Sequence, residues 1–530
     1  MYTKSPSFHL KISSIIALLF VLACSTPGDQ DNERGSYLEQ HRPQFHFTPD
    51  SMWMNDPNGL VFYDGEYHLF YQHNPGNNVW GPMHWGHAVS EDMIHWEHLP
   101  IALYPDSLGT IFSGSAVIDW NNSSGLQDRD HPPMLAIFTH HNMEIEQSGL
   151  DTFQYQSIAY SNDKGRSWKK YIGNPVLGNP GIRDFRDPKV IWHEEVQKWI
   201  MVLAAYDRVF FYSSPNLTNW TWESEFGLNV GAHGGAWECP ELMPLEFDGD
   251  EKWILLVSVA SDGPNGGSGT QYFVGEFDGS SFSNENPAKE AMWLEYGRDN
   301  YAGVTFSNMA EDDGRRILIG WMSNWEYAQV VPTERWRNAM TIPRELYLDL
   351  ISNHYEVFCK PIGELDTLRK DSFEIEPAFI SGKMDLREGE KYESSMYEIN
   401  LEFNIPSGTQ NGIASEFGFM LSNSLDEQLT VGYSTSDELV YIDRTISGKD
   451  EFSEQFPGIH KAPLSLSTTE SIMMNAYIDK ASIELFINQG KSVMTEIFFP
   501  SEDYDKISLF AHNGSVILES GIVYNLKSIH

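Results

Sequence analysis

Three acidic residues in this chain stand in sequence surroundings that suit positioned carboxylates. Asp56 lies in the segment Trp-Met-Asn-Asp-Pro-Asn-Gly, Asp187 lies in Phe-Arg-Asp-Pro, and Glu238 lies in Trp-Glu-Cys-Pro. Each has an aromatic residue within three positions before it and a proline within two positions after it. A solvated surface acid needs no such rigid surroundings, whereas a carboxylate that transfers a proton or attacks a substrate does.

Two carboxyl groups that face each other are the basic equipment of glycoside hydrolysis. Taken singly, any of the three acids has an equally good interpretation as a turn-forming or capping residue. Asp56 and Asp187 are separated by 131 positions, and Asp187 and Glu238 by 51 positions. Only the tertiary fold can therefore bring them to one pocket.

Short strands and turns dominate the chain from about residue 45 onward. Residues 59–71 read as two strands joined at an Asp-Gly turn, which is a strong hairpin signal. A Ser-to-Trp segment then occurs three times, at residues 90–96, 161–168 and 213–220. A four-stranded sheet cannot bury both of its faces alone, and stacking such sheets around an axis solves that problem. We therefore predict an all-β chain that begins with a five-bladed β-propeller over residues 37–350.

The pattern changes after residue 350. Residues 351–372 are predicted to be a linker that includes a helical turn. From residue 373 to residue 530 the sequence shows alternating strands, for example at 397–403 and 482–487. We predict that this region is a separate C-terminal β-sandwich.

The first 24 residues have the character of an export signal. Lys4 and Lys11 give a basic start, and residues 12–23 form a mostly apolar run, shorter than the roughly 20 residues that span a membrane. The run ends at Cys24 after a small residue, which resembles the bacterial lipoprotein signal, whose cysteine is acylated after cleavage. We predict a signal peptide over residues 1–24 and a lipid anchor at Cys24, with ordinary cleavage beside an incidental cysteine as the alternative. Such an anchor would attach an exported protein to the outer membrane or cell surface, or to the periplasmic face.

The overall charge excludes one class of partner. The 530 residues carry 35 Lys and Arg against 75 Asp and Glu, a net charge of −40. Nucleic-acid binding depends on clustered cations, so this protein is predicted not to bind nucleic acid. The balance suits a neutral ligand such as a sugar. Outside the signal only Cys239 and Cys359 remain, and no metal-ligand motif with the usual spacing is present.

The three carboxylate segments, in this order, resemble glycoside hydrolase family 32, which includes invertases, inulinases and levanases. Further similarity lies in Phe-Ser-Gly-Ser at 112–115, in residues 320–328 and 336–346, and in the region 478–500, so it covers nearly the whole mature chain. The resemblance implies a five-bladed propeller followed by a β-sandwich. It also implies a retaining reaction on β-fructofuranosyl linkages of fructan, fructo-oligosaccharide or sucrose, without a metal or cofactor.

The resemblance also assigns roles to particular residues. It makes Asp56 the nucleophile, Glu238 the acid and base, and Asp187 the stabiliser of the transition state. Residues that match the family's fructose-binding positions are Asn55, Gln72, Trp80, Phe112, Ser113, Arg186 and Trp325. For Phe112 and Trp325, packing inside a blade is the alternative interpretation.

Several functions remain compatible with these residues. One alternative is a five-bladed enzyme that cleaves arabinan, and another is a non-catalytic surface lipoprotein that binds glycans. A third is fructosyl transfer to sugar acceptors. Levan and inulin fit equally well as substrates, as do exo and endo modes of action, and the sequence assigns no oligomeric state.

Overall fold

The structure is a computed structural model that describes residues 1, 37–286, 291–310, 313–387, 395–405, 412–464 and 471–530. The predicted signal peptide and Cys24 lie outside the described residues. The chain divides into two units, residues 1–39 and 40–530, and the second contains every strand described below. No helix among the residues described is long and apolar enough to cross a membrane.

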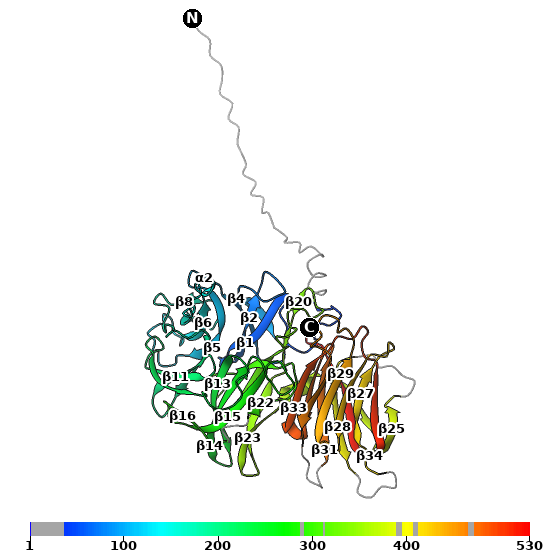
Figure 1. The fold of residues 1–530 in the computed structure, drawn as a ribbon. Coiled ribbons are helices and arrows are strands. Elements are labelled where there is room, and N and C mark those ends of the chain that lie inside the picture. The colour runs from blue at the N-terminus through cyan, green and yellow to red at the C-terminus, as the bar shows by residue number, and fades with distance from the viewer. Residues whose placement is uncertain (2–36, 287–290, 311–312, 388–394, 406–411, 465–470) are drawn as a thin grey trace. The chain divides into compact units, whose positions relative to one another are not determined.

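Five sheets make up the first part of the second unit, coloured blue to green in Figure 1. The first contains β1 (Met52–Tyr63), β2 (Glu66–Asn74), β3 (His84–Ser90), β4 (Glu97–Leu103) and the short β20 (Trp336–Arg337). The second contains β5 (Thr110–Ile118), β6 (Met134–His141), β7 (Gln154–Ser161) and β8 (Lys169–Lys170), and the short helix α2 (Met143–Gln147) follows β6. The third contains β9 (Phe185–His193), β10 (Lys198–Ala205), β11 (Val209–Ser214) and β12 (Thr221–Phe226).

The last two sheets of this part follow the same plan. The fourth contains β13 (Trp237–Phe247), β14 (Asp250–Val259), β15 (Gly269–Phe277), β16 (Phe282–Asn284) and β17 (Met292–Trp293). The fifth contains β18 (Tyr301–Thr305), β19 (Arg316–Met322), β21 (Ala339–Met340), β22 (Arg344–Ile351) and β23 (His354–Pro361).

The five sheets form a closed ring. The first long strand of each sheet contacts its counterparts in the order β1, β5, β9, β13, β18 and back to β1, so these are the innermost strands. The ring is further closed by β20, which pairs in parallel with β1 through Met52 and Trp336. The predicted five-bladed propeller is therefore confirmed, and the starts of its innermost strands lie at one end of the axis.

The repeated Ser-to-Trp segments form the same turn in three blades. Each follows the third strand of its blade, and the indole N–H of its tryptophan donates to the backbone carbonyl three residues earlier. These bonds join Trp96 to Met93, Trp168 to Gly165 and Trp220 to Leu217 at 3.0, 3.0 and 3.1 Å. The sequence repeat thus marks one structural unit per blade.

The second part is a sandwich-like arrangement of strands, coloured yellow to red in Figure 1. Its longest strand, the 21-residue β34 (Lys506–Leu526), pairs along its length with four others. Those partners are β24 (Arg369–Ile375), β25 (Ala378–Asp385), β26 (Tyr397–Asn404) and β27 (Glu416–Ser422). The remaining elements are β28 (Gln428–Ser434), β29 (Leu439–Ile446), β30 (Ile459–Pro463), β31 (Ile472–Asp479), β32 (Ser482–Ile487), η2 (Asn488–Gly490) and β33 (Ser492–Ile497).

The segment predicted to be a linker, residues 351–372, contains regular structure. It holds β23, which pairs with β22 in the fifth blade from Arg344↔Pro361 to Ile351↔His354, and then the 3₁₀ helix η1 (Gly363–Leu368). β24 begins within the same segment. We propose that the boundary between the two domains lies between β23 and η1.

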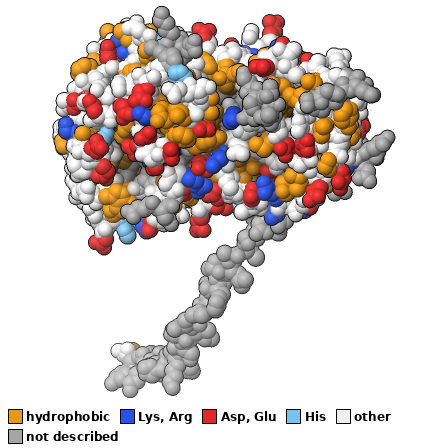
Figure 2. All heavy atoms as spheres, turned by 90° about the horizontal axis from the view of Figure 1, so that it is seen from below, with side chains coloured by type: hydrophobic (Ala, Val, Ile, Leu, Met, Phe, Trp, Pro, Cys, Tyr) orange, Lys and Arg blue, Asp and Glu red, His pale blue; other side chains and the backbone are white. Residues whose placement is uncertain are grey.

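Buried ion pairs join the propeller to the sandwich. Arg344 of β22 bonds to Glu484 of β32 with both side chains fully buried. Arg444 of β29 bonds to Asp299, which lies two residues before β18 begins. A buried charge needs a fixed partner, so these ion pairs fix the position of one domain against the other. Acidic side chains are scattered over the face in Figure 2 and outnumber the basic ones, as the composition predicts for a solvated surface.

Candidate active site

One local irregularity occurs in all five innermost strands. In each, the inner strand advances by three positions between two successive paired residues, whereas the neighbouring strand advances by only two. The five stretches are 54–57 in β1, 111–114 in β5, 186–189 in β9, 238–241 in β13 and 301–304 in β18. Such an extra residue bends a strand and redirects its side chains, and bulges of this kind are common beside active sites. All three sequence-predicted carboxylates fall within these stretches or at their ends.

Three positions in these stretches, Asp187, Cys239 and Ala302, also have an unusual backbone. Asp187 and Cys239 have φ values of 64° and 44°, in the left-handed region that non-glycine residues seldom adopt. Hydrogen bonds hold this backbone in place, because Asp187 N donates to Thr139 Oγ1 at 3.0 Å and Cys239 N donates to Asp187 Oδ2 at 3.1 Å. At these two residues the strained backbone lies where side chains must point into one site.

The Asp56 carboxylate accepts hydrogen bonds on both of its oxygens. Ser113 Oγ donates to Oδ2 at 2.8 Å, and Asn55 Nδ2 donates to Oδ1 at 3.0 Å. The thiol of Cys239 lies 3.8 Å from Asp56 Oδ2 and 3.7 Å from Asp187 Oδ2, so one buried sulfur touches both carboxylates. Asp56 itself stays partly exposed, which leaves it open to a ligand.

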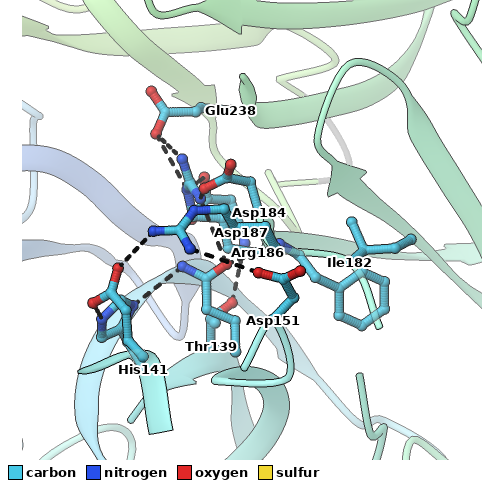
Figure 3. Close-up of polar contacts among 12 residues, drawn as sticks. Thr139, His141, Asp151, Ile182, Asp184, Arg186, Asp187 and Glu238 are labelled. Carbon is cyan, nitrogen blue, oxygen red and sulfur yellow. Dashed lines mark hydrogen bonds and ion pairs between the residues drawn. The ribbon is translucent and has the colours of Figure 1, made fainter. Parts of the chain in front are cut away.

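Arg186 lies between Glu238 and two further acids of the site, Asp184 and Asp187, as Figure 3 shows. Its Nη2 donates to Glu238 Oε1 at 2.7 Å, and its Nη1 bonds to Asp184. Its Nε lies 3.8 Å from Asp187 Oδ2. One guanidinium thus bridges three carboxylates, which fixes their geometry and offsets part of their mutual repulsion.

The clustered carboxylates shift each other's protonation. Burial raises the pKa of Asp56, and the charge of Glu238 raises it further, while hydrogen bonds from Asn55 and Ser113 lower it. Burial raises the pKa of Asp187 to about 7, against the opposing effect of Arg186. A site with this excess of negative charge stabilises positive charge that develops on a bound substrate, as in an oxocarbenium-like transition state.

Tyr301 and Asp184 also belong to the site, although neither is predicted from the sequence. The Tyr301 hydroxyl, fully buried at the start of β18, donates to Glu238 Oε2. No motif marks Tyr301, and only its place at the start of the fifth innermost strand could have pointed to it. Asp184 stands three residues before Asp187, where an acid near an arginine is too common a pattern to single out.

The predicted sugar-binding residues fall into three groups. Asn55, Ser113 and Arg186 contact the carboxylates directly. Trp80 and Phe112 pack edge to face at 6.1 Å, and both stay partly exposed beside Ser113.

Gln72 and Trp325 do not contact the carboxylates. Gln72 is buried and donates to Asn58, whose own amide donates to the Asp56 carbonyl. Trp325 stacks on Trp53 with ring centroids 5.9 Å apart. Both therefore reach the site through a neighbouring residue.

Comparison with known proteins identifies the family. Residues 46–361 match the N-terminal domain of glycosyl hydrolases family 32, and residues 364–525 match the family's C-terminal domain. The chain belongs to glycoside hydrolase family 32. The structure agrees, because the crystal structure of exo-inulinase from Aspergillus awamori superimposes with a TM-score of 0.84 and 35% identity, covering 93% of this chain and 100% of that one.

Two further relatives extend the family assignment. A levanase from Bacillus subtilis (strain 168) is 47% identical over 520 residues, covering 97% of this chain and 75% of the relative. A β-fructofuranosidase from Schwanniomyces occidentalis, solved with fructosyl-erythritol, has a TM-score of 0.83 and 30% identity, covering 93% of this chain and 99% of that chain. Family membership makes this chain a glycosidase that acts on β-fructosides.

Proposed function

We propose that this family 32 enzyme hydrolyses β-fructofuranosyl linkages in fructans and fructo-oligosaccharides with retention of configuration. The observation that carries the proposal is the convergence of Asp56, Asp187 and Glu238 at one end of the propeller axis. Cys239 contacts the first two, and Arg186 bonds to the third. The relatives named as levanase and exo-inulinase support fructan as the substrate class.

The proposed reaction proceeds in two steps. Asp56 attacks the anomeric carbon C2, and the bond from C2 to the leaving oxygen breaks as Glu238 donates its proton to that oxygen. Glu238, now a carboxylate, takes a proton from water, whose oxygen attacks C2 and releases Asp56. Two inversions give net retention, and the reacting carboxyl groups of such enzymes lie about 5–5.5 Å apart. Asp187 holds fructose hydroxyls while positive charge develops at C2.

Hydrogen bonds prepare the two reacting groups for these roles. Ser113 and Asn55 donate to Asp56 and favour its ionised form, which the attack requires. Arg186 and Tyr301 each hold one oxygen of Glu238, so its orientation is fixed before substrate arrives. A preorganised site of this kind avoids reorganisation during the reaction.

The findings do not support a non-catalytic glycan-binding protein, because all three carboxylates are present and hydrogen-bonded in one site. They also argue against an arabinan-cleaving enzyme, since both family 32 models match. Transfer of fructose to a sugar acceptor would use the same residues. The ratio of free fructose to elongated product at high sucrose concentration separates transfer from hydrolysis.

The proposal is tested by chromatography of early products from levan and from inulin. Release of fructose alone identifies an exo mode, and a ladder of oligomers identifies an endo mode. The Asp56→Asn variant should release no product while it keeps its fold and its binding of sugar. The proposal would be contradicted if the wild-type enzyme released no product from levan and none from inulin. Near-normal turnover by Asp56→Asn would contradict it as well.

We also propose that the protein is exported and anchored through acylated Cys24. The basic start, the apolar run and the position of Cys24 support this, and relatives include enzymes named as extracellular. Metabolic labelling with a fatty-acid analogue in a bacterial host should mark the wild-type chain and leave Cys24→Ala unlabelled. An unlabelled wild-type chain would show ordinary cleavage instead.

A further inference from the structure

A second cavity lies at the opposite end of the propeller axis from the carboxylates. Its volume is about 810 Å³, and its lining includes later residues of four of the five innermost strands, such as Ile118 in β5, Ile191 in β9 and Met243 in β13. The catalytic residues come from the starts of those strands. On β9 the residues that line this cavity begin at Lys189, two residues beyond Asp187, and continue to His193.

A buried polar plug separates this cavity from the active site. Lys189 Nζ lies 2.8 Å from Glu241 Oε1 and donates to the Thr305 carbonyl at 3.0 Å, while Thr305 N donates to Glu241 Oε2 at 3.0 Å. Beside the plug, only a void of about 10 Å³ remains, room for about one water molecule. Lys189 and Thr305 line both this void and the second cavity, so the plug lies between that cavity and the side of the propeller that holds Asp187.

An aromatic platform stands at the rim of the second cavity. Trp120 lines it and is 57% exposed. Its indole N–H donates to Asn308 Oδ1 at 2.8 Å, Asn308 Nδ2 donates to the Phe62 carbonyl at 2.7 Å, and the ring packs edge to face on Tyr63 at 5.8 Å. A single exposed tryptophan is unremarkable, but this one is held rigidly at a cavity. A fixed, exposed indole offers an apolar face on which a sugar ring can stack.

Arg316 supplies hydrogen-bond donors in the same cavity. Its side chain is half-buried, and its guanidinium has one long contact, 3.5 Å to the Arg315 carbonyl, and no ion pair within the described part of the chain. Burial lowers the pKa of Arg316, and nearby Glu241 and Glu251 oppose this effect. A guanidinium has five N–H donors. Most of those on Arg316 are left for water or for a polar ligand.

The charge of the cavity selects the ligand class. Six carboxylate residues and two cationic residues line it, which disfavours phosphate and other anions. No group of three or more metal-ligating side chains occurs among the described residues, so nothing here favours a metal ion. The volume lies within the roughly 300–1,000 Å³ of small-molecule pockets. An uncharged polyhydroxyl ligand suits all three features of the cavity. Its ring can stack on the indole, and its hydroxyls can accept from the free N–H groups and donate to the surplus carboxylates.

We propose that this cavity is a second carbohydrate-binding site, which takes a segment of the fructan chain. The choice of fructan rests on the proposed function, because a polymer substrate is the neutral saccharide that the enzyme meets. A chain held at this end of the propeller stays attached to the enzyme while other ends of the polymer reach Asp56. The site thus contributes to polymer binding without taking part in the reaction.

The test separates polymer binding from catalysis. Trp120→Ala removes the platform and, independently, Arg316→Gln removes the charged guanidinium with its five donors and leaves an amide with two. Trp222→Ala is the matched control, since Trp222 is 53% exposed on β12 and does not line the cavity. Mobility in native gels containing levan or inulin reports polymer binding, and kinetics on sucrose and on the retarding polymer report catalysis. Circular dichroism and melting temperatures verify that each variant is folded.

We expect levan or inulin to retard the wild-type enzyme and Trp222→Ala. Removal of one aromatic contact should weaken retardation and raise the KM for polymer by about tenfold in Trp120→Ala. Arg316→Gln should shift both readouts in the same direction, while kcat/KM on sucrose stays within about twofold in every variant. Unretarded wild-type enzyme, or folded variants that match it on polymer, would overturn the second site. Failure of the wild-type enzyme to hydrolyse any fructan would instead overturn the proposed function.

Discussion

Removal of the hydroxyl that supports the nucleophile should shift the pH profile in a defined direction. Ser113 Oγ donates to Asp56 Oδ2 at 2.8 Å, and this bond is one of the interactions that lower the pKa of Asp56. In Ser113→Ala the ionised carboxylate loses that donor, so the pKa of Asp56 rises. Because the reaction requires ionised Asp56, the acidic limb of kcat/KM moves to higher pH.

The size of this shift follows from the chemistry of the bond. A hydrogen bond to a charged group is worth about 1.5–3 kcal/mol, and one pKa unit corresponds to about 1.36 kcal/mol. Loss of the whole bond would therefore raise the pKa of Asp56 by about 1–2. Asp56 is partly exposed, so water replaces part of the lost interaction and the shift should lie near 1 unit. On the acidic limb this corresponds to a kcat/KM that is roughly tenfold lower relative to the plateau.

The assay is the initial rate of fructose release over a pH series for wild type, Ser113→Ala and a control. Ser115→Ala is a suitable control, because Ser115 is equally buried on β5 but bonds to the Pro188 carbonyl and to Val190 N rather than to a carboxylate. The control should keep the wild-type acidic limb. An unshifted limb in Ser113→Ala, or a shift toward lower pH, would refute this reasoning about Asp56.

Three further predictions follow from other contacts. Glu238→Gln should lose much more activity on sucrose than on an activated aryl fructoside, and equal losses would remove its role as the acid. Tyr301→Phe deletes one bond to Glu238 and should lower kcat/KM on sucrose by about tenfold, with a smaller loss on the aryl fructoside; equal losses would indicate a merely structural role. Although burial opposes it, bonds to Asp479 and Glu484 raise the pKa of His46 to about 9. The stabilisation from His46 is therefore fully present below about pH 6.5 and is lost as the pH rises through about 9. The melting temperature of His46→Gln should accordingly lie further below that of the wild type at pH 6 than at pH 10. A difference that does not depend on pH would contradict this.

The three carboxylates that the structure brings together could be singled out from the sequence because their local surroundings are distinctive. Rigid prolines and bulky aromatic residues around Asp56, Asp187 and Glu238 coincide with bulged starts of innermost strands. The Ser-to-Trp segments likewise revealed the blades, since each encodes a closed turn with its own hydrogen bond. Features that depend on a few neighbouring residues are legible in this way.

Features that depend on distant pairing were not legible. Tyr301 reaches Glu238 only because the fifth blade closes against the fourth, and no local pattern records that contact. β23, which falls in the segment predicted to be a linker, is a different case, because it pairs with the adjacent β22 through the short turn at Ser352 and Asn353. The plug of Lys189 and Glu241, and the cavity behind it, arise where several strands meet along the axis.

The central claim is that Asp56 forms a covalent bond to fructose during turnover. The most direct measurement is peptide mapping by mass spectrometry after rapid acid quenching of Glu238→Gln, with an activated aryl fructoside as substrate. Loss of the base slows hydrolysis of the intermediate, so it accumulates. The peptide that contains Asp56 should carry one fructosyl group, and that group should disappear in the Asp56→Asn variant. A fructosyl group on another residue, or turnover with no labelled peptide, would contradict the double-displacement account.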